Sequence, residues 1–141
     1  MSESTKSPKV FISYSWQPIQ NKNWTLEFAE RLSRDGVHVI IDEWDASEGM
    51  DKYSFMEQMV NDPNIMRVLL ICNSSYQTKA NDKKGGVGIE SMIISDEIYS
   101  QADQTKFIPI VRESKDGTAC LPTFVNSRFY IDLSDPEYFE D

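Results

Sequence analysis

The sequence contains only two cysteines and a single histidine. Cys72 and Cys120 are too few for a disulfide framework, and neither has a histidine at the spacing of a metal site. We therefore expect two free thiols in a reducing cytoplasm and no metal ion. His38 lies inside a predicted strand, which favours a structural role and leaves serine or cysteine hydrolase chemistry without a base.

Positive charge is also scarce, since 14 lysines and arginines face 23 acidic residues and the net charge is −9. A domain with this balance repels the phosphates of nucleic acids and of anionic lipids. We therefore expect no direct nucleic-acid or membrane binding by this domain. The exception is a lysine cluster, formed by Lys79, Lys83 and Lys84, which would supply local positive charge to an anionic ligand.

Long hydrophobic runs are missing as well. The run from Val68 to Cys72 is far shorter than the roughly 20 apolar residues that cross a bilayer as a helix. Residues 1–8 are polar and lack the apolar stretch of a secretory signal, so we predict a disordered lead there. The length of 141 residues and the 40% hydrophobic content are typical of one globular domain, which we expect to be cytoplasmic.

The sequence does contain an alternation of strand-like and helix-like segments. Helical spacing of apolar residues occurs at 24–32, at 53–60 and at 89–99, with a loop expected over 17–23. Short apolar runs predict five strands, at 9–13, 37–41, 67–72, 107–111 and 129–132. This alternation predicts an α/β fold, a flavodoxin-like three-layer sandwich. Its five-stranded parallel sheet has the order 2-1-3-4-5, with helices on both faces.

In a sheet of this order, ligands bind beyond the carboxyl ends of the strands, where strands one and three lie side by side. Aromatic rings, hydroxyl groups and a carboxylate follow the first three predicted strands, and these suit a planar ring with ribose or phosphate oxygens. The candidate lining comprises residues after the first and third strands, bordered by residues after the second: Ser13, Tyr14, Ser15, Trp16, Asn73, Ser74 and Ser75, with Asp42, Glu43 and Trp44 at the border. Composition alone is equally compatible with an alternative, in which Trp16 and Trp44 cap the core.

The glycine motifs of dinucleotide-binding and P-loop proteins are absent from the sequence. The stretch from Gly85 to Gly88 does not directly follow a strand, and its glycines equally suit a close approach of the backbone to a ligand. Carboxylates remain as catalytic candidates, because Glu90 and Glu97 share one face of the predicted helix. Glu90 also falls in the first turn of that helix, where an acid complements the helix dipole without any catalytic role.

Four motifs, in order along the chain, resemble those of Toll/interleukin-1 receptor (TIR) domains. Lys9–Ser15 resembles their opening strand, Gly36–Trp44 their second strand, and Asp45–Asp51 their BB loop. Asn73–Tyr76, followed by Gly85–Glu90, is similar to bacterial TIR and closely related SEFIR-type sequences.

The resemblance covers about residues 8 to 133 and implies a TIR domain over residues 9–135. Asp135 and Pro136 have the pattern of a helix cap and first turn, so residues 136–141 are predicted to start a C-terminal helix. We interpret that short helix as the place where a longer multidomain protein continues.

The NAD-cleaving members of this family imply an NAD+ glycohydrolase. Such an enzyme breaks the nicotinamide–ribose bond and releases nicotinamide with ADP-ribose or a cyclic ADP-ribose. NAD+ is then the substrate and no cofactor is implied. Glu90 matches the catalytic glutamate, and the substrate-binding positions implied are Ser13, Tyr14, Ser15, Trp16, Asp42, Trp44, Ser74 and Gly86. Bacterial members further imply activation by self-assembly into an oligomer or filament, and a role as effector of an antiphage defence protein with a fused C-terminal sensor.

At two of the implied binding positions, this sequence differs from the NAD-cleaving members of the family. Some NAD-cleaving members carry a tryptophan four residues before the glutamate, where this chain has Gly86. The basic residue often found after the first-strand motif is replaced by Ser15 and Trp16. Aromatic cover for nicotinamide would then come from Trp16, Trp44 or a neighbouring chain, and the lysine cluster would face the pyrophosphate.

Other members of the family are non-enzymatic adaptors, and this is the alternative function that the resemblance implies. An adaptor signals by association with other TIR domains and does not consume NAD+. The BB loop makes that contact, and its matching residues are Asp45, Ser47, Glu48, Gly49 and Met50.

Overall fold

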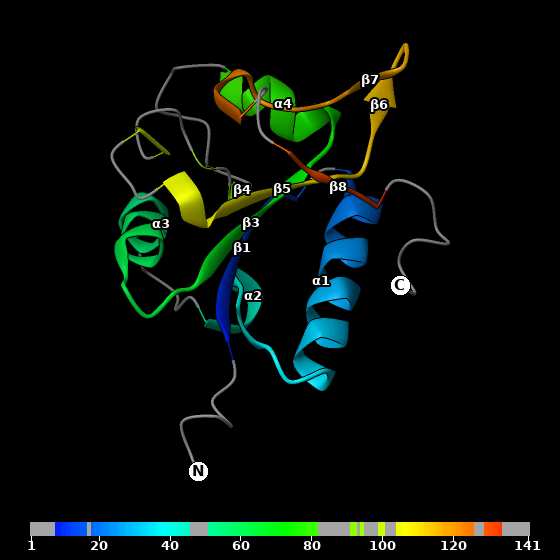
Figure 1. Ribbon diagram of the computed structural model, residues 1–141. Helices are drawn as coiled ribbons and strands as arrows, with labels where there is room; N and C mark the ends of the chain where they lie inside the picture. The colour runs from blue at the N-terminus through cyan, green and yellow to red at the C-terminus, as the bar shows by residue number, and fades with distance from the viewer. Residues whose placement is uncertain are drawn as a thin grey trace.

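The computed structural model describes residues 8–16, 18–45, 51–81, 91–92, 94, 99–100, 104–125 and 129–133. Its centre is a parallel sheet with strands in the order β2-β1-β3-β5-β8 (Figure 1). Numbered along the chain, these strands read 2-1-3-4-5, so the predicted α/β topology is confirmed. The strands are β1 Lys9–Ser15, β2 His38–Ile40, β3 Arg67–Cys72, β5 Phe107–Val111 and β8 Ile131–Asp132.

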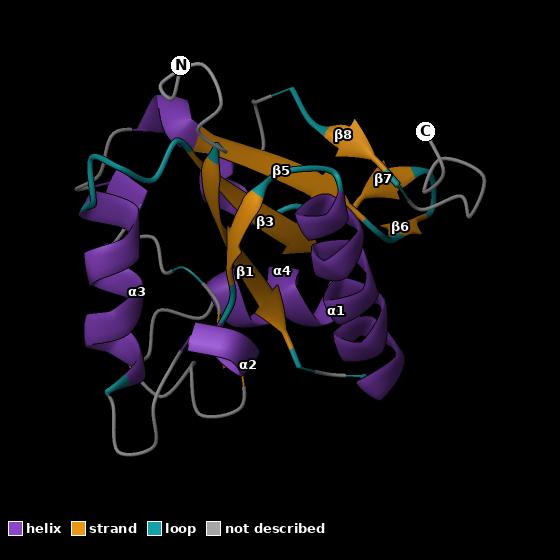
Figure 2. Ribbon diagram, turned by 90° about the horizontal axis from the view of Figure 1, so that it is seen from below, coloured by secondary structure: helices purple, strands orange, loops and turns teal. Residues whose placement is uncertain are grey.

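Helices cover both faces of this sheet. Figures 1 and 2 show α1 and α4 on opposite faces. The physical reason is that the chain crosses toward one edge after β1 and toward the other edge after β3, and crossovers between parallel strands are right-handed. The helices are α1 Ile19–Arg34, α2 Asp42–Asp45, α3 Lys52–Asn61 and α4 Ser74–Asn81, with 3₁₀ turns at Gln104–Lys106 and Thr123–Val125.

The core is built around β3, which pairs with β1 on one side and β5 on the other. Its residues from Val68 to Cys72 are all buried, as the uninterrupted apolar run predicts for a strand covered on both faces. Leu70 lies between Ser13 of β1 and Pro109 of β5 and is fully buried. The most apolar segment of the chain therefore occupies the middle of the sheet.

The start of α1 differs from the prediction of a loop over 17–23. The helix begins at Ile19, directly after Pro18, whose extended backbone occupies the N-cap position. The side chain of Asn21 is buried and donates to the carbonyl of Ser15 at 2.8 Å. This tertiary contact stabilises a first turn that has weak helical propensity by itself. The helix ends at Arg34, and Gly36, two residues later, has a left-handed conformation at φ 99°.

The predicted continuous helix over 89–99 is wrong at its beginning. Residues 91–92 form a short strand, β4 (Ser91–Met92), antiparallel to the end of β1. Ser91 pairs with Ser15, and Met92 with Tyr14. Apolar periodicity cannot reveal a backbone partner so distant in sequence, and here the tertiary pairing overrides the local pattern. The predicted shared helix face of Glu90 and Glu97 lies outside the described residues.

Three further elements were not expected from the sequence. After β2 the chain turns at once into α2, where strand-like continuation was predicted. Asn73 begins α4 by accepting the backbone N–H of Tyr76 at 2.9 Å. A hairpin of β6 (Ser114–Lys115) and β7 (Thr118–Ala119) turns through Asp116 and Gly117, both at positive φ, as a type I′ turn requires.

Cys72 and Cys120 are both buried and free in the structure. Burial raises the pKa of both thiols above the ordinary cysteine value. Within the described ranges, no helix is long and apolar enough to span a membrane. The predictions of a disordered lead and of a C-terminal helix at 136–141 concern residues almost all outside those ranges.

Candidate functional site

The carboxyl end of β1 carries polar side chains to both faces of the sheet, because successive residues of a strand point to opposite sides. Ser13 and Ser15 face α4, whereas Tyr14 and the following Trp16 reach toward α2. Ser13, Tyr14 and Ser15 belong to the strand itself and are fully buried. The strand predicted from the apolar run ended at Ser13, whereas β1 continues to Ser15.

On the α4 face, buried hydroxyl groups bind one another. The hydroxyl oxygens of Ser13 and Tyr76 are 2.7 Å apart, and those of Ser15 and Ser75 are 2.8 Å apart. The backbone N–H of Ile94 donates to the Tyr76 hydroxyl at 3.2 Å. Burial raises the pKa of Tyr76 above its ordinary value, so its phenol is neutral. These contacts connect α4 to β1, and they connect Ile94 to α4.

On the opposite face, the carboxylate of Asp42 accepts two hydrogen bonds, one from Tyr14 of β1 and one from Trp16, which directly follows β1. The Tyr14 hydroxyl donates to Oδ1 of Asp42 at 2.7 Å, and the indole N–H of Trp16 donates to Oδ2 at 3.1 Å. Asp42 is buried, with 7% of its surface exposed. The ammonium of Lys22 lies 5.0 Å from the centroid of the Trp16 ring, within the range of a cation–π contact.

The Asp42 cluster, meaning Asp42 with Tyr14 and Trp16, lies directly before the predicted BB loop. Asp42 is the first residue of α2, and α2 ends at Asp45. On the far side of residues 46–50, Asp51 caps α3 by accepting the backbone N–H of Ser54 at 2.9 Å. This hydrogen bond lowers the pKa of the Asp51 carboxyl. Both flanks of the loop segment are thus attached to the body of the domain.

A third group of polar residues, which was not predicted from the sequence, follows β5. Glu113 accepts the backbone N–H of Ser74, the first residue of α4, at 2.8 Å. Arg112 lies 4.1 Å from the Trp24 ring of α1 and donates to the carbonyl of Leu133. Partial burial lowers the pKa of this guanidinium. The sequence signal for these two charges is their position directly after a buried strand, the same position that Tyr14 and Asp42 have near the ends of predicted strands.

The structure brings some of the predicted binding residues together and separates others. Tyr14, Trp16 and Asp42 meet in one cluster, while Ser74 lies on α4 with its backbone bound to Glu113. Trp44 is 45% exposed on α2, so it does not cap the core, whereas Trp16 packs against the core. The predictions for Ser47, Glu48, Gly49, Met50, Gly86 and Glu90 concern residues outside the described part of the chain.

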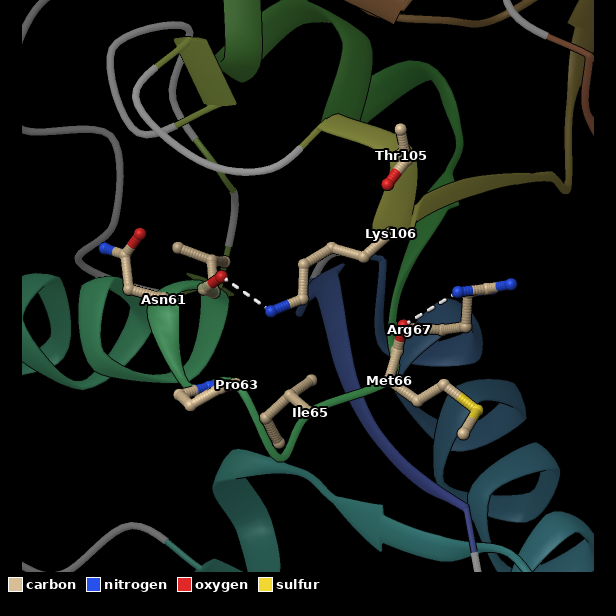
Figure 3. A pocket seen from close by; sticks show the side chains of 8 residues that line it. Asn61, Pro63, Ile65, Met66, Arg67, Thr105 and Lys106 are labelled. Carbon is tan, nitrogen blue, oxygen red and sulfur yellow. Dashed lines mark hydrogen bonds between the residues drawn. The ribbon is translucent and has the colours of Figure 1, made fainter.

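A cavity of about 450 Å³ lies at the amino ends of β3 and β5 (Figure 3). The Asp42 cluster lies at the other end of the parallel strands, where their carboxyl ends are. Figure 3 shows Lys106 extending toward α3, where its ammonium donates to the carbonyls of Val60 at 3.0 Å and Asp62 at 3.1 Å. Arg67 extends the other way and donates to the carbonyl of Met66. The two cations therefore do not converge on one point, and Lys106 acts as a tie to the end of α3.

The strand order and the arrangement of helices define a TIR-like α/β domain. The family model of the SEFIR domain matches residues 8–140, and the chain therefore belongs to the SEFIR domain family. The crystal structure of a prokaryotic SEFIR domain is 42% identical with a TM-score of 0.81, covering 95% of this chain and 88% of that one.

A second solved structure is similar in fold. The TIR domain of the Toll-related receptor TRR-2 from Hydra magnipapillata is 17% identical with a TM-score of 0.63, over 91% of this chain and 86% of that one. At this identity the likeness concerns the fold alone. A comparison with curated proteins gave no match. The predicted resemblance to TIR and SEFIR domains is confirmed at the level of family and fold.

Proposed function

We propose that this chain is a protein-interaction module, which associates with other SEFIR or TIR domains through the segment from Asp45 to Asp51. The observation that carries the proposal is the attachment of the helix before this segment by the Asp42 cluster. In the structure, Tyr14 and Trp16 bind Asp42 of α2, and Ser13 and Ser15 bind hydroxyl groups of α4. This arrangement supports the adaptor function better than an open nucleotide crevice.

Two physical features favour association at this place. A segment held at both flanks loses less conformational freedom on binding than a free loop, so more of the contact energy remains as affinity. Trp44, which is 45% exposed on the helix before the segment, offers a large aromatic surface of the kind enriched at interface hot spots. Because each copy carries a net charge of −9, we expect salt to strengthen the association by screening repulsion.

The first test replaces Met50 in the segment with glutamate. We expect Met50→Glu to weaken self-association at least tenfold, about 1.4 kcal/mol, because it replaces an apolar side chain of the proposed contact segment with a charged one. Sedimentation velocity over a concentration series would measure the dissociation constant. Met66→Glu is the matched control, since Met66 is 54% exposed at the opposite edge of the sheet. Equal loss in both variants, or a wild type that stays monomeric at every concentration, would contradict the proposal.

A second candidate is the NAD+ glycohydrolase reaction, with Glu90 as the essential carboxylate. One observation favours it: Ser91, the next residue in the chain, pairs with Ser15 at the carboxyl end of β1, the edge where doubly wound sheets bind ligands. Nicotinamide leaves as a neutral molecule, so no general acid is required. A carboxylate beside the ribose would stabilise the oxocarbenium-like transition state by charge. A single glutamate is sufficient for this chemistry.

The second candidate predicts nicotinamide release by the associated protein and its loss in Glu90→Ala. Chromatography of the reaction would measure nicotinamide and would separate ADP-ribose from its cyclic form. Glu97→Ala is the control for the general effect of removing an acid from this stretch. NAD+ that remains intact while the protein is fully associated would exclude the enzyme function and leave the adaptor function standing. The role as an antiphage effector with a fused sensor domain stays a prediction from the resemblance.

A further inference from the structure

We infer that the cavity at the amino ends of β3 and β5 binds a small dicarboxylate, a short organic chain with one carboxylate bound at Lys106 and the other at Arg67. The cavity measures about 450 Å³. Small-molecule sites in proteins measure roughly 300–1,000 Å³, so the space is sufficient for such a ligand. The inference does not depend on the proposed association.

Lys106 places a positive charge inside the domain. Its side chain is 8% exposed, and its ammonium donates to the carbonyls of Val60 at 3.0 Å and Asp62 at 3.1 Å. Both acceptors are neutral, and among the residues that the structure describes no carboxylate forms an ion pair with Lys106. A buried charge is unfavourable unless an opposite charge accompanies it. An ammonium has three N–H donors, so one of them remains for a ligand.

Arg67 provides a second positive charge, at the rim of the cavity. It is the exposed first residue of β3, and within the described ranges its one hydrogen bond runs to the carbonyl of Met66 at 3.0 Å. A guanidinium has five N–H donors in a planar fork that matches a carboxylate. The chain has 23 acidic residues against 14 basic ones. Nevertheless, the described lining of this cavity contains these two cations and no acid.

The directions of the two side chains select the shape of the ligand. Figure 3 shows Lys106 extending toward α3 and Arg67 extending the other way. A compact ion such as phosphate would therefore meet only one of the charges, whereas an elongated molecule with an acid at each end can meet both. The lining also includes Ile65, which is 2% exposed, and Met66. These apolar side chains suit the methylene groups between two carboxylates.

A ligand series tests whether both charges are used. Dicarboxylates from succinate to suberate are each compared with the monocarboxylate of equal chain length, at constant ionic strength and on the full chain. We expect the best-fitting dicarboxylate to bind about fivefold more tightly than its monocarboxylate, the effect of one solvated ion pair. The methyl resonance of Met66, in protein with ¹³C-labelled methionine methyl groups, would follow each titration.

Two variants assign the second carboxylate to its residue. Arg67→Gln should weaken the dicarboxylate about fivefold and leave the monocarboxylate within about twofold of the wild type, because the single carboxylate lies at Lys106. Lys115→Gln is the matched control. It removes the same charge from the exposed strand β6, and it should leave the affinity for both ligands unchanged.

Four results would overturn the inference. The first is a wild type that binds no dicarboxylate up to about 50 mM. The second is equal affinity for dicarboxylates and monocarboxylates, and the third is an equal effect of Arg67→Gln and Lys115→Gln. Inorganic phosphate that binds more tightly than every dicarboxylate would be the fourth, because the site would then hold a compact ion. None of these results bears on whether the domain associates.

Discussion

Leu70→Ala is expected to lower the free energy of unfolding by about 3–5 kcal/mol, the largest stability effect of a single side chain that we predict. Leu70 is fully buried on β3, between Ser13 of β1 and Pro109 of β5. Both faces of this central strand are covered, so the surrounding side chains have little freedom to close the space left by the missing methyl groups. The loss of stability therefore has two parts: less apolar surface is removed from water on folding, and a cavity remains in the core.

Urea denaturation followed by circular dichroism would measure this change as a lower midpoint with an unchanged slope. Met66→Ala is the control, because Met66 stands just before the same strand and is 54% exposed. Its effect should stay within about 0.5 kcal/mol. A cost below about 1.5 kcal/mol for Leu70→Ala would mean that β3 is not the centre of a closely packed core.

Lys106→Met is expected to lower the free energy of unfolding by about 2–4 kcal/mol, because it leaves one buried and one partly buried carbonyl group without their charged donor. The ammonium of Lys106 binds the carbonyls of Val60, in the last turn of α3, and of Asp62 just beyond it. The last carbonyls of a helix have no partner within the helix, and a positive charge there also complements the helix dipole. Only 8% of the Lys106 surface is exposed.

Methionine keeps most of the length and apolar surface of the lysine chain, so the substitution isolates the ammonium. Lys115→Met, on the exposed β6 strand, is the matched control and should be nearly neutral. Amide exchange in the last turn of α3 should accelerate in Lys106→Met alone. Unchanged stability and unchanged exchange in that variant would show that the end of α3 has no need of Lys106.

The central strand and one of the helices show why much of the fold was predictable from the sequence. The run from Val68 to Cys72 could only be buried on both faces, so its place in the interior of a parallel sheet follows from composition. The helix over 52–61 was also predictable, since its apolar spacing is regular and Pro63 follows its end. In both cases the determining pattern is local and has a single period.

The errors occur where a partner outside the local apolar pattern decides the structure: a distant strand in one case, and a side-chain bond to a residue six positions earlier in the other. The apolar spacing of the sequence around residues 91–92 is typical of a helix. These two residues nevertheless pair with Tyr14 and Ser15 as a strand. The first turn of α1 depends on the bond from Asn21 to the carbonyl of Ser15. Local periodicity contains no record of such partners, so the sequence pattern predicted the wrong element at both places.

The candidate site was predicted as a set of residues, and its arrangement was not. The rule that ligand sites follow parallel strands selected Tyr14, Trp16 and Asp42 correctly as neighbours. It could not tell that their polar groups would bind each other, or that Tyr76 would close the opposite face. Lys106 was missed altogether, because a lysine before a strand has no distinguishing pattern.

By itself, the sequence determined the fold class, the order of the five parallel strands and the family to which the domain belongs. These follow from apolar runs and motif order, which are properties of contiguous residues. Only the tertiary structure decided that Asp42 accepts a hydrogen bond from Tyr14, 28 positions away. The same holds for Lys106, which binds a carbonyl at the end of α3, 46 positions away. The physical reason is that a buried polar group must find a partner in space, and strand register and helix placement determine which partner is within reach.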